Sequence, residues 1–497
     1  MKKTIIDLFK LYYSIMEKNQ AKTILTKEGY LLLKSKFKKT ELDIIKKELT
    51  VKPQLSYSIG IKTKVEEFPV FKENDTYLSI PKFYGLKNIG KPEVDDQIKG
   101  SKIKFKFNGK LRPIQKEIVN EVLDHMKINE GGGICVGCGW GKTVMGIYVA
   151  KKQKRKTLVI VHKTFLLNQW KERIEQFTNA KVGIIQQNKI EVEGNDIVIG
   201  MLQSIAKEKY DPDIFRDFGL VIFDEAHHAP SKFFSKALPL ISCKKTLFLT
   251  ATPKRSDRLE KVLYWYFGDI IYKSPPSKNN NVNVNIYNYS IKHDKFKESY
   301  MRFTKEVNKA QTITRLSKIS KRNKFIVELL TETLDEEGRK ILVLSDRIDH
   351  LNRLKESLDK LDIDSNYYIG GMKQSKLDES AESTVILASY GMASEALDIP
   401  TLNTLFMVTP RRSIQQSVGR ILRAKTDTEP LIVDIVDQLP SFNNQGMHRR
   451  KYYKKLKYNT KLFNVEENEI ISEQDLFEDN NSVCDIDMVE TLDLFID

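Results

Sequence analysis

The sequence predicts an α/β protein with two parallel-sheet lobes in tandem, a small N-terminal accessory domain before them and an acidic C-terminal tail after them. The chain has 497 residues, and at roughly 150 residues a domain this length predicts about three domains. Its composition, 40% hydrophobic and 30% charged, is typical of globular proteins and excludes collagen-like and wholly disordered chains. From Leu111 onward, short β-branched runs alternate with helical patterns in two series, a pattern typical of parallel sheets flanked by helices.

The N-terminal half is expected to hold the accessory domain and the first lobe. Residues 1–100 alternate Lys-rich amphipathic stretches with strand-like runs such as Tyr77–Ile80 and carry no recognisable chemistry, so we expect a small accessory domain there. The first lobe is expected over residues 101–275. Its strand-like runs are Gly133–Val136, Thr157–Val161, Asp196–Ile199, Leu220–Phe223 and Thr246–Leu249.

The C-terminal half is expected to hold the second lobe and the tail. The segment Lys273–Asn281 has two prolines and a run of asparagines, which indicates a connector. The second lobe is expected over residues 276–445, and residues 446–497 are expected to hold a basic segment and the acidic tail. The strand-like runs of the second lobe are Ile341–Leu344, Thr384–Leu387, Thr404–Val408 and Leu431–Ile435.

The distribution of charge favours a polyanionic partner. The net charge is +16, yet residues 465–497 contain twelve acidic residues and no Lys or Arg, which leaves +28 on residues 1–464. Such an excess favours nucleic acid, because bound cations release counterions from the phosphate backbone. A Lys-rich composition is also typical of an A/T-biased genome, with which the Ile and Asn usage agrees, so charge alone leaves both explanations open.

Several classes of protein are not expected. The apolar runs, such as Leu158–Val161, have only a few residues, far short of the roughly 18 that span a bilayer, and Asp7 and Lys10 interrupt any signal-peptide core. The four cysteines give no disulfide framework, and the Cys135–Cys138 pair lacks the second pair that zinc needs. We therefore expect an intracellular protein with no membrane association.

A glycine-rich segment has the pattern of a phosphate-binding loop. The run Gly131–Thr143 (GGGICVGCGWGKT) lies between a short strand and a helix expected to begin near Thr143, which is the context such a loop requires. Lys142 would neutralise the β and γ phosphates, and the Thr143 hydroxyl would hold Mg²⁺. The first position of the pattern is Val136 instead of glycine, and the alternative is a glycine-rich turn that caps an ordinary helix. The predicted ATP-binding residues of this loop are Gly139, Gly141, Lys142 and Thr143.

A pair of acids follows the apolar strand Leu220–Phe223. In FDEAHH, Asp224 would hold Mg²⁺ through water, and Glu225 would orient and deprotonate the attacking water. Because consecutive strand residues project to opposite faces, a turn must begin here to bring both acids near the phosphates. The alternative is a solvated strand end, with His227 as a hydrogen-bonded structural residue. The phosphate loop about 80 residues upstream favours the catalytic interpretation.

With these two motifs the chain resembles the DEAH-type superfamily 2 helicases and translocases, from about Leu111 to Asp437. Further motifs stand in the family order. They are LRPIQ at 111–115, VHKTFLLNQW at 161–170, MLQS at 201–204, TATP at 250–253, ILVLSDR at 341–347, ASYGMASEALDIP at 388–400 and QQSVGRILR at 415–423.

The resemblance implies two RecA-like lobes that bind ATP and Mg²⁺, and it assigns roles to individual residues. Arg420 and Arg423 lie three apart on one helix face and would contact the γ-phosphate as arginine fingers. Gln416 would position water or phosphate. The implied contacts to adenine come from Arg112 and Gln115, those to the nucleic-acid strand from Gln203 and Ser204, and the coupling of hydrolysis to motion from His227, Thr250, Thr252 and Asp398.

Within the superfamily, the order GWGKT, DEAHH, TATPKR and LYWYFGDIIY resembles the XPB and UvsW group most. Helicases of large DNA viruses, including the poxvirus transcript-release type, belong nearby, and the Lys, Ile and Asn bias agrees with a viral member. The chain departs from the family pattern at Val136 and at Ala396, where the family usually has small residues or glycine. These departures put coupling efficiency in question more than ATP binding.

We therefore expect an ATP hydrolase acting as a DNA helicase or translocase in viral transcription, replication or repair. The alternatives are an RNA helicase and a nucleic-acid-binding factor that does not hydrolyse ATP. The expected partner is nucleic acid, DNA more than RNA, with transcription or replication proteins as candidate partners and the chain itself a monomer. A viral member would also be expected in the virion or the viral factory.

The C-terminal segment carries a separate hypothesis. The run His448–Lys461 has seven cations interleaved with Tyr452, Tyr453 and Tyr458, and such a pattern can bind phosphates and stack on bases. The alternative is a solvated helix whose tyrosines pack on the second lobe. The acidic residues after Val465 would form a mostly disordered tail that competes with nucleic acid for the basic run.

Overall fold

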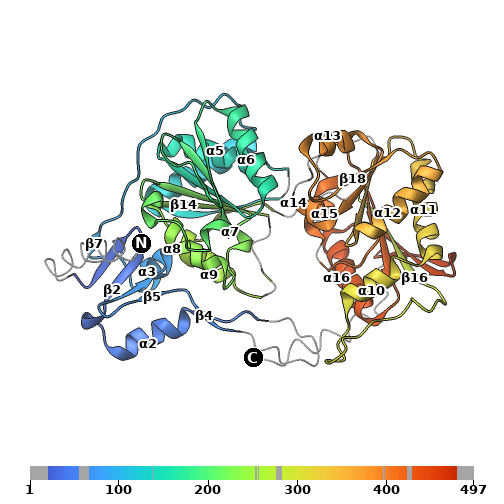
Figure 1. Cartoon of the computed structure of the whole chain (residues 1–497), viewed down its shortest axis with the longest axis horizontal. Helices are drawn as coiled ribbons and strands as arrows, with labels where there is room; N and C mark the ends of the chain where they lie inside the picture. Colours follow the sequence, from blue (N-terminus) through green and yellow to red (C-terminus); the bar gives the residue numbers. More distant parts are fainter. Residues whose placement is uncertain are drawn as a thin grey trace. The chain divides into compact units, whose positions relative to one another are not determined.

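The structure is a computed structural model, and it divides the chain into two units, Met1–Ser274 and Pro275–Asp497 (Figure 1). It describes residues 21–54, 66–137, 139–251, 255, 257–275, 282–395, 397, 399–412, 414–422 and 428–477. Four sets of predicted features lie outside these residues. They are Thr252, Asp398 and Arg423, the side chain of Gln416, most of the predicted connector, and the acidic residues after Phe477.

The first lobe is an eight-stranded sheet in which every neighbouring pair is parallel except the edge pair β10 and β11. The apolar run of β9 is buried over its whole length, as expected for a parallel strand covered on both faces. In sheet order the strands are β11 (Lys189–Ile190), β10 (Val182–Gln186), β12 (Ile197–Met201), β9 (Thr157–Val161), β13 (Leu220–Asp224), β14 (Lys245–Thr250), β8 (Gly131–Cys135) and β15 (Ile270–Lys273).

Helices cover both faces of this sheet. One hydrophobic core joins the sheet to α4, α5 and α6, and a second core on the other face joins it to α7, α8 and α9. Figure 1 shows α5 and α6 on one side of the sheet and α7 to α9 on the other. The helices are α4 (Pro113–Ile128), α5 (Lys142–Gln153), α6 (Thr164–Phe177), α7 (Leu202–Ile205), α8 (Leu238–Ile241) and α9 (Glu260–Phe267).

The N-terminal region has its own five-stranded sheet and a separate two-stranded sheet, and most of its buried apolar side chains belong to the second of these cores. The ring of Tyr84 packs edge-on against Trp265 at 5.5 Å, and the Tyr266 hydroxyl donates to the Val70 carbonyl. This region is therefore packed against the first lobe. Its elements are β1 (Thr23–Thr26), β2 (Gly29–Leu33), α2 (Lys39–Glu48), β3 (Thr50–Val51), β4 (Phe68–Pro69), β5 (Lys72–Glu73), β6 (Tyr77–Ile80), α3 (Lys82–Asn88) and β7 (Val94–Asp95).

A buried lysine ties α3 to the first lobe. The Lys82 ammonium lies 2.7 Å from a Glu130 carboxylate oxygen and donates to the Lys244 carbonyl and to Gln97. Burial lowers the pKa of Lys82, while Glu130 opposes that shift. Since Glu130 immediately precedes β8, this ion pair connects the N-terminal region to the base of the phosphate-loop strand.

Replacing Lys82 with methionine should destabilise the first unit. The change keeps the length of the side chain but leaves Gln97 and the Lys244 carbonyl without their donor, which costs about 1–3 kcal/mol. Lys87→Met on the same helix removes an exposed lysine 3.7 Å from Asp269 and is the matched control, with an expected effect of about 0.5 kcal/mol or less. Urea unfolding of the two variants measures the difference, and equal midpoints would contradict the structural role of Lys82.

The second lobe is also an eight-stranded sheet, parallel except for its last pair, β22 and β23. In sheet order its strands are β18 (Ser365–Tyr368), β19 (Val385–Ser389), β17 (Ile341–Ser345), β20 (Thr404–Met407), β21 (Leu431–Asp437), β16 (Asn283–Ser290), β22 (Asn459–Glu466) and β23 (Glu469–Leu476). Its helices are α10 (Lys309–Leu316), α11 (Ser320–Leu334), α12 (Ile348–Lys360), α13 (Gln374–Glu382), α14 (Tyr390–Glu395), α15 (Gln415–Ile421) and α16 (Pro440–Leu456). The prediction of two parallel-sheet α/β lobes is confirmed.

The second sheet continues beyond residue 445, where the sequence analysis ends the lobe. The basic run forms the C-terminal half of α16 and the start of β22, and β22 pairs in parallel with β16. Part of the acidic segment forms β23, which pairs with β22 and places Glu473 2.8 Å from Lys461. The description of residues 466–476 as a disordered tail is therefore wrong, because strand pairing satisfies their backbone groups.

Aromatic and charged side chains of the basic run belong to the core of this lobe. Tyr453 and Tyr458 are buried. Arg449 is buried as well and forms a two-pronged ion pair with Asp434, which also accepts from the Tyr453 hydroxyl. Stacking of these two tyrosines on bases is therefore wrong, and the alternative, in which the tyrosines pack on the lobe, is confirmed for them.

Candidate nucleotide-binding site

The glycine-rich segment forms a tight loop between β8 and α5. Gly139 and Gly141 have φ values of +78° and +76°, in the left-handed region that glycine adopts without strain. A Cβ atom on Gly141 would lie 2.4 Å from the Gln115 amide nitrogen, so a larger residue there would displace the Gln115 side chain. Gly141 caps α5, which begins at Lys142, and the free N–H groups of this helix end suit an anion.

Two side chains of the LRPIQ segment donate hydrogen bonds to backbone carbonyls of this loop. Arg112 donates to the Gly139 carbonyl at 2.9 Å, and the Gln115 amide donates to the Trp140 carbonyl at 2.8 Å. The Gln115 carbonyl oxygen also accepts from the Arg112 backbone N–H. The structure thus places both residues at the phosphate loop, and their predicted contact with adenine stays a prediction.

Lys142 and Glu225 approach each other at the carboxyl ends of the strands. The Lys142 ammonium lies 3.4 Å from the carbonyl oxygens of Val136 and Gly137 and 3.9 Å from a Glu225 carboxylate oxygen. Both side chains are largely buried. The cation predicted to bind phosphate and the carboxylate predicted to activate water therefore lie side by side, although the two residues are 83 positions apart in the chain.

The two acids of FDEAHH have different backbone conformations because strand β13 ends between them. Asp224 is the last residue of β13, and Glu225 has φ +47° before the short helical turn η3 (Ala226–His228). The turn that the sequence analysis requires at this point is therefore present. Burial, together with the neighbouring Glu225, raises the pKa of Asp224 to about 6. A buried carboxylate of this kind is stabilised in its ionised form by a cation.

The donor set at this edge fits Mg²⁺. Magnesium prefers hard oxygen ligands and commonly keeps several waters, with one or two carboxylates and substrate phosphates completing its shell. Asp224 offers a buried carboxylate, and Thr143, one residue after Lys142, offers a hydroxyl at the start of α5. These are the two residues predicted to hold the ion.

Trp170 contacts the candidate site, although the sequence analysis assigns it no role beyond the VHKTFLLNQW motif. Its ring is fully buried in α6, and its indole N–H donates to an Asp224 carboxylate oxygen at 2.7 Å. This bond lowers the pKa of Asp224 against the effect of burial. A buried tryptophan usually needs an acceptor for its N–H, so the sequence indicates that Trp170 has a partner, but it does not identify Asp224 as that partner.

Replacing Trp170 with phenylalanine should impair ATP hydrolysis most at low pH. Without the indole donor the pKa of Asp224 rises further, so more of the carboxyl is protonated at a given pH and the acidic limb of the pH–rate profile moves to higher pH. Trp265→Phe, at the interface with the N-terminal region, is the matched control. Steady-state ATPase rates between pH 5 and 8 test this, and an unshifted acidic limb in the Trp170 variant would contradict it.

Histidines connect the turn to neighbouring motifs. The His227 ring nitrogen Nδ1 lies 3.2 Å from the Thr250 hydroxyl and 3.4 Å from a Glu225 oxygen. The centroid of the His228 ring lies 4.2 Å from that of His227 and 3.9 Å from that of His162. The structure therefore brings two predicted coupling residues, His227 and Thr250, into contact beside the predicted general base.

The predicted strand-contacting residues bond to the protein backbone. Gln203 donates to the His162 carbonyl, and the Ser204 hydroxyl accepts from the Gln187 N–H at 3.0 Å. In the second unit, Arg420 is buried on α15 and donates to the Leu397 carbonyl at 2.6 Å. Contacts of Gln203 and Ser204 with nucleic acid, and of Arg420 with the γ-phosphate, stay predictions.

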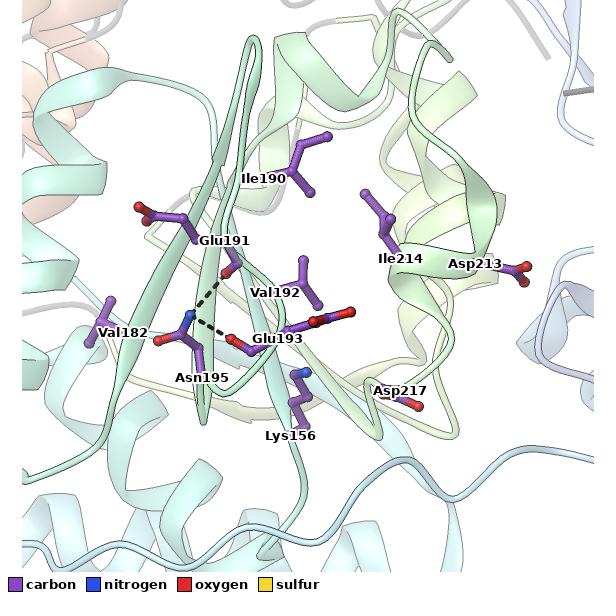
Figure 2. A pocket seen from close by; sticks show the side chains of 10 residues that line it. All are labelled: Lys156, Val182, Ile190, Glu191, Val192, Glu193, Asn195, Asp213, Ile214 and Asp217. Carbon is purple, nitrogen blue, oxygen red and sulfur yellow. Dashed lines mark hydrogen bonds between the residues drawn. The ribbon is translucent and has the colours of Figure 1, made fainter.

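A pocket of about 550 Å³ lies in the first lobe at the opposite edge of the sheet (Figure 2). Lys156 precedes β9, Asn195 precedes β12 and Asp217 precedes β13, so the pocket lies at the amino ends of the strands. Glu191, Glu193, Asp213 and Asp217 line it with a single lysine. An acidic pocket at that edge is unsuited to phosphate and is separate from the nucleotide-binding site.

Two α/β lobes, the first with a phosphate loop facing an Asp–Glu pair, define the class of two-lobed P-loop nucleoside triphosphatases. Two family models match the chain: "Type III restriction enzyme, res subunit" over residues 108–255 and "Helicase conserved C-terminal domain" over residues 320–425. The chain belongs to the superfamily 2 helicases, so the family that the motifs indicate is confirmed.

Relatives from large DNA viruses agree with this membership. The chain is 39% identical to "Putative ATP-dependent RNA helicase L396" of Acanthamoeba polyphaga mimivirus, over 90% of this chain and 88% of the relative. It is 26% identical to "Putative ATP-dependent RNA helicase QP509L" of African swine fever virus (isolate Pig/Kenya/KEN-50/1950), over 69% and 72%. The structure of S. cerevisiae Dbp5 L327V bound to RNA and ADP BeF3 shares the fold, with 12% identity, a TM-score of 0.50, and coverage of 71% of this chain and 90% of that one. No helix in the described part of the chain is long and apolar enough to cross a membrane.

Proposed function

We propose that the chain is an ATP-dependent DNA translocase or helicase that hydrolyses ATP at the carboxyl edge of the first sheet. The observation that carries the proposal is the approach of Lys142 to within 3.9 Å of Glu225 beside a buried Asp224. Lys142 would neutralise the terminal phosphates. Glu225 would take the proton of the attacking water. Thr143 and Asp224 would hold Mg²⁺, which would supply charge stabilisation for the phosphates.

The contacts around Glu225 support a link between hydrolysis and movement. His227 touches both Glu225 and the Thr250 hydroxyl, and Arg255 donates to the His227 carbonyl. A change in the hydrogen bonds of Glu225 would therefore move His227 and, through it, Thr250 and Arg255 at the end of β14 and just after it. Gln416, Arg420 and Arg423 of the second lobe would complete the site on ATP binding, so that hydrolysis and lobe closure occur together.

Nucleic acid is the proposed track, and phosphate contacts would dominate its binding. The excess of +28 on residues 1–464 supports a salt-sensitive interaction with low sequence specificity. The names of the mimivirus and swine fever virus relatives describe RNA helicases, and RNA is therefore the second candidate track.

ATP turnover measured without nucleic acid, with single-stranded DNA and with RNA of equal length tests the proposal. We expect stimulation by nucleic acid, larger for DNA, that falls as salt rises. Equal rates in all three conditions would contradict coupling. Stimulation by RNA alone would replace the DNA track by the alternative.

A further inference from the structure

The most exposed aromatic side chain of the described residues lies on a short hairpin between β16 and α10. Phe303 is 92% exposed, and its neighbours Tyr300 and Met301 are 58% and 47% exposed. Figure 1 shows this part of the chain as a loop that projects beyond α10. We call Ser299–Asn308 the aromatic hairpin. Exposure of a large ring at this level needs a reason, since burying it would be favourable by about 1.5–3 kcal/mol.

Backbone bonds fix the aromatic hairpin at its base. The Asn308 N–H donates to the Ser299 carbonyl at 2.6 Å, and the Met301 N–H donates to the Glu306 carbonyl at 2.7 Å. Ser299 is buried, and its N–H donates to the Thr312 hydroxyl of α10. These hydrogen bonds fix the base of the hairpin, which carries Phe303, to helix α10 of the second lobe.

The charges of the aromatic hairpin favour a polyanion. Arg302 and Lys305 flank Phe303 and are exposed. Between residues 292 and 309 there are six cations and three acids. One of these acids, Glu298, accepts from the Ser441 N–H at the start of α16 and from the Tyr300 hydroxyl, so its charge is already engaged. The cores of protein–protein interfaces are depleted of charge, whereas an aromatic ring between cations is typical of sites for single-stranded nucleic acid.

We propose that Phe303 stacks on an unpaired base of single-stranded nucleic acid, with Arg302 and Lys305 on the adjacent phosphates. The inference deepens the proposed function, because it assigns part of the nucleic-acid track to the second lobe. A base within a duplex has both faces covered by its neighbours, so an exposed ring gains contact area only from an unpaired base or an end. Stacking does not discriminate between bases, which agrees with a translocase of low sequence specificity.

A tryptophan reporter tests the contact directly in the full-length chain. Phe303→Trp keeps the stacking surface, and its fluorescence should fall saturably when oligo(dT) or oligo(rU) is added. Leu361→Trp is the control, because Leu361 is an exposed residue, at 52%, after α12 of the same lobe. We expect a smaller change or none in the control and in Phe303→Trp with a blunt duplex. Equal quenching of the two reporters would overturn the proposal.

Affinity measurements separate this inference from the proposed function. Phe303→Ala should weaken binding of single strands about five-fold or more, leave binding of blunt duplex within about two-fold, and leave the ATPase rate without nucleic acid unchanged. If wild type binds single strands and Phe303→Ala binds them equally well, this inference is wrong and the proposed function stands. If wild type binds no nucleic acid at low salt, the proposed function itself fails.

Discussion

Replacing Glu225 with glutamine should leave ATP bound and stop its hydrolysis. Glutamine has the shape of glutamate but cannot accept the proton of the attacking water, and loss of a general base typically costs about 10²–10⁴-fold in rate. Binding should be retained because Lys142 and the N–H groups of α5 still face the phosphates. Phosphate release gives the hydrolysis rate, and a fluorescent ATP analogue gives the affinity.

The matched control for this variant is Glu175→Gln, which neutralises an exposed glutamate on α6. It should leave turnover within about two-fold, because a surface ion pair contributes little. A Glu225→Gln enzyme that turns over near the wild-type rate would place the general base on another residue. A variant that also loses nucleotide affinity would instead show that Glu225 helps to hold the loop through Lys142.

Replacing Lys142 with methionine should weaken nucleotide binding and, with it, lower activity. The ammonium lies among the Val136 and Gly137 carbonyls and Glu225. A charge-assisted hydrogen bond contributes about 1.5–3 kcal/mol, so the loss of its phosphate contact should weaken ATP binding about 10- to 100-fold. Equilibrium binding of ATP measures this, and thermal unfolding confirms that the loop still folds.

The control for the lysine variant lies on the same helix. Lys152→Met changes an exposed lysine near the far end of α5, 5.4 Å from the Tyr148 ring, and should leave ATP affinity unchanged. Near wild-type affinity in Lys142→Met would show that α5 and the glycine loop bind phosphate without this cation. That result would contradict the role of Lys142 in phosphate binding.

The strands and the two motifs of the first lobe could be predicted because their causes are local. The run of β9 is a short apolar segment rich in β-branched residues, and the structure gives it the predicted bounds Thr157–Val161. Gly139 and Gly141 both have positive φ, a conformation that glycine adopts without strain, so a glycine-rich run before a helix is a local signal for this loop. The turn at Glu225 follows from the need to bring consecutive acids to one side of a strand.

Strand β16 shows where local reasoning was insufficient. Its sequence, NVNIYNYS, alternates asparagine with apolar residues next to the predicted connector, and the sequence analysis assigns no strand to it. It nevertheless lies inside the second sheet, between β21 and β22. Asparagine is disfavoured in strands, but here the Asn288 side-chain amide donates to the Asn464 side-chain oxygen on the neighbouring strand β22 at 2.9 Å, and that partner becomes adjacent only in the folded lobe.

The sequence by itself determined the two α/β lobes, the phosphate loop with Lys142, and the Asp224–Glu225 turn. The tertiary structure decided which distant groups complete them. Trp170 supplies the donor for Asp224, and Arg112 holds the loop through Gly139. The physical reason is that burial obliges a polar group to find a partner without specifying which one. Backbone conformation and hydrophobic periodicity depend on a few neighbouring residues. These hydrogen-bond partners, in contrast, depend on the packing of helices and strands that are remote in the chain.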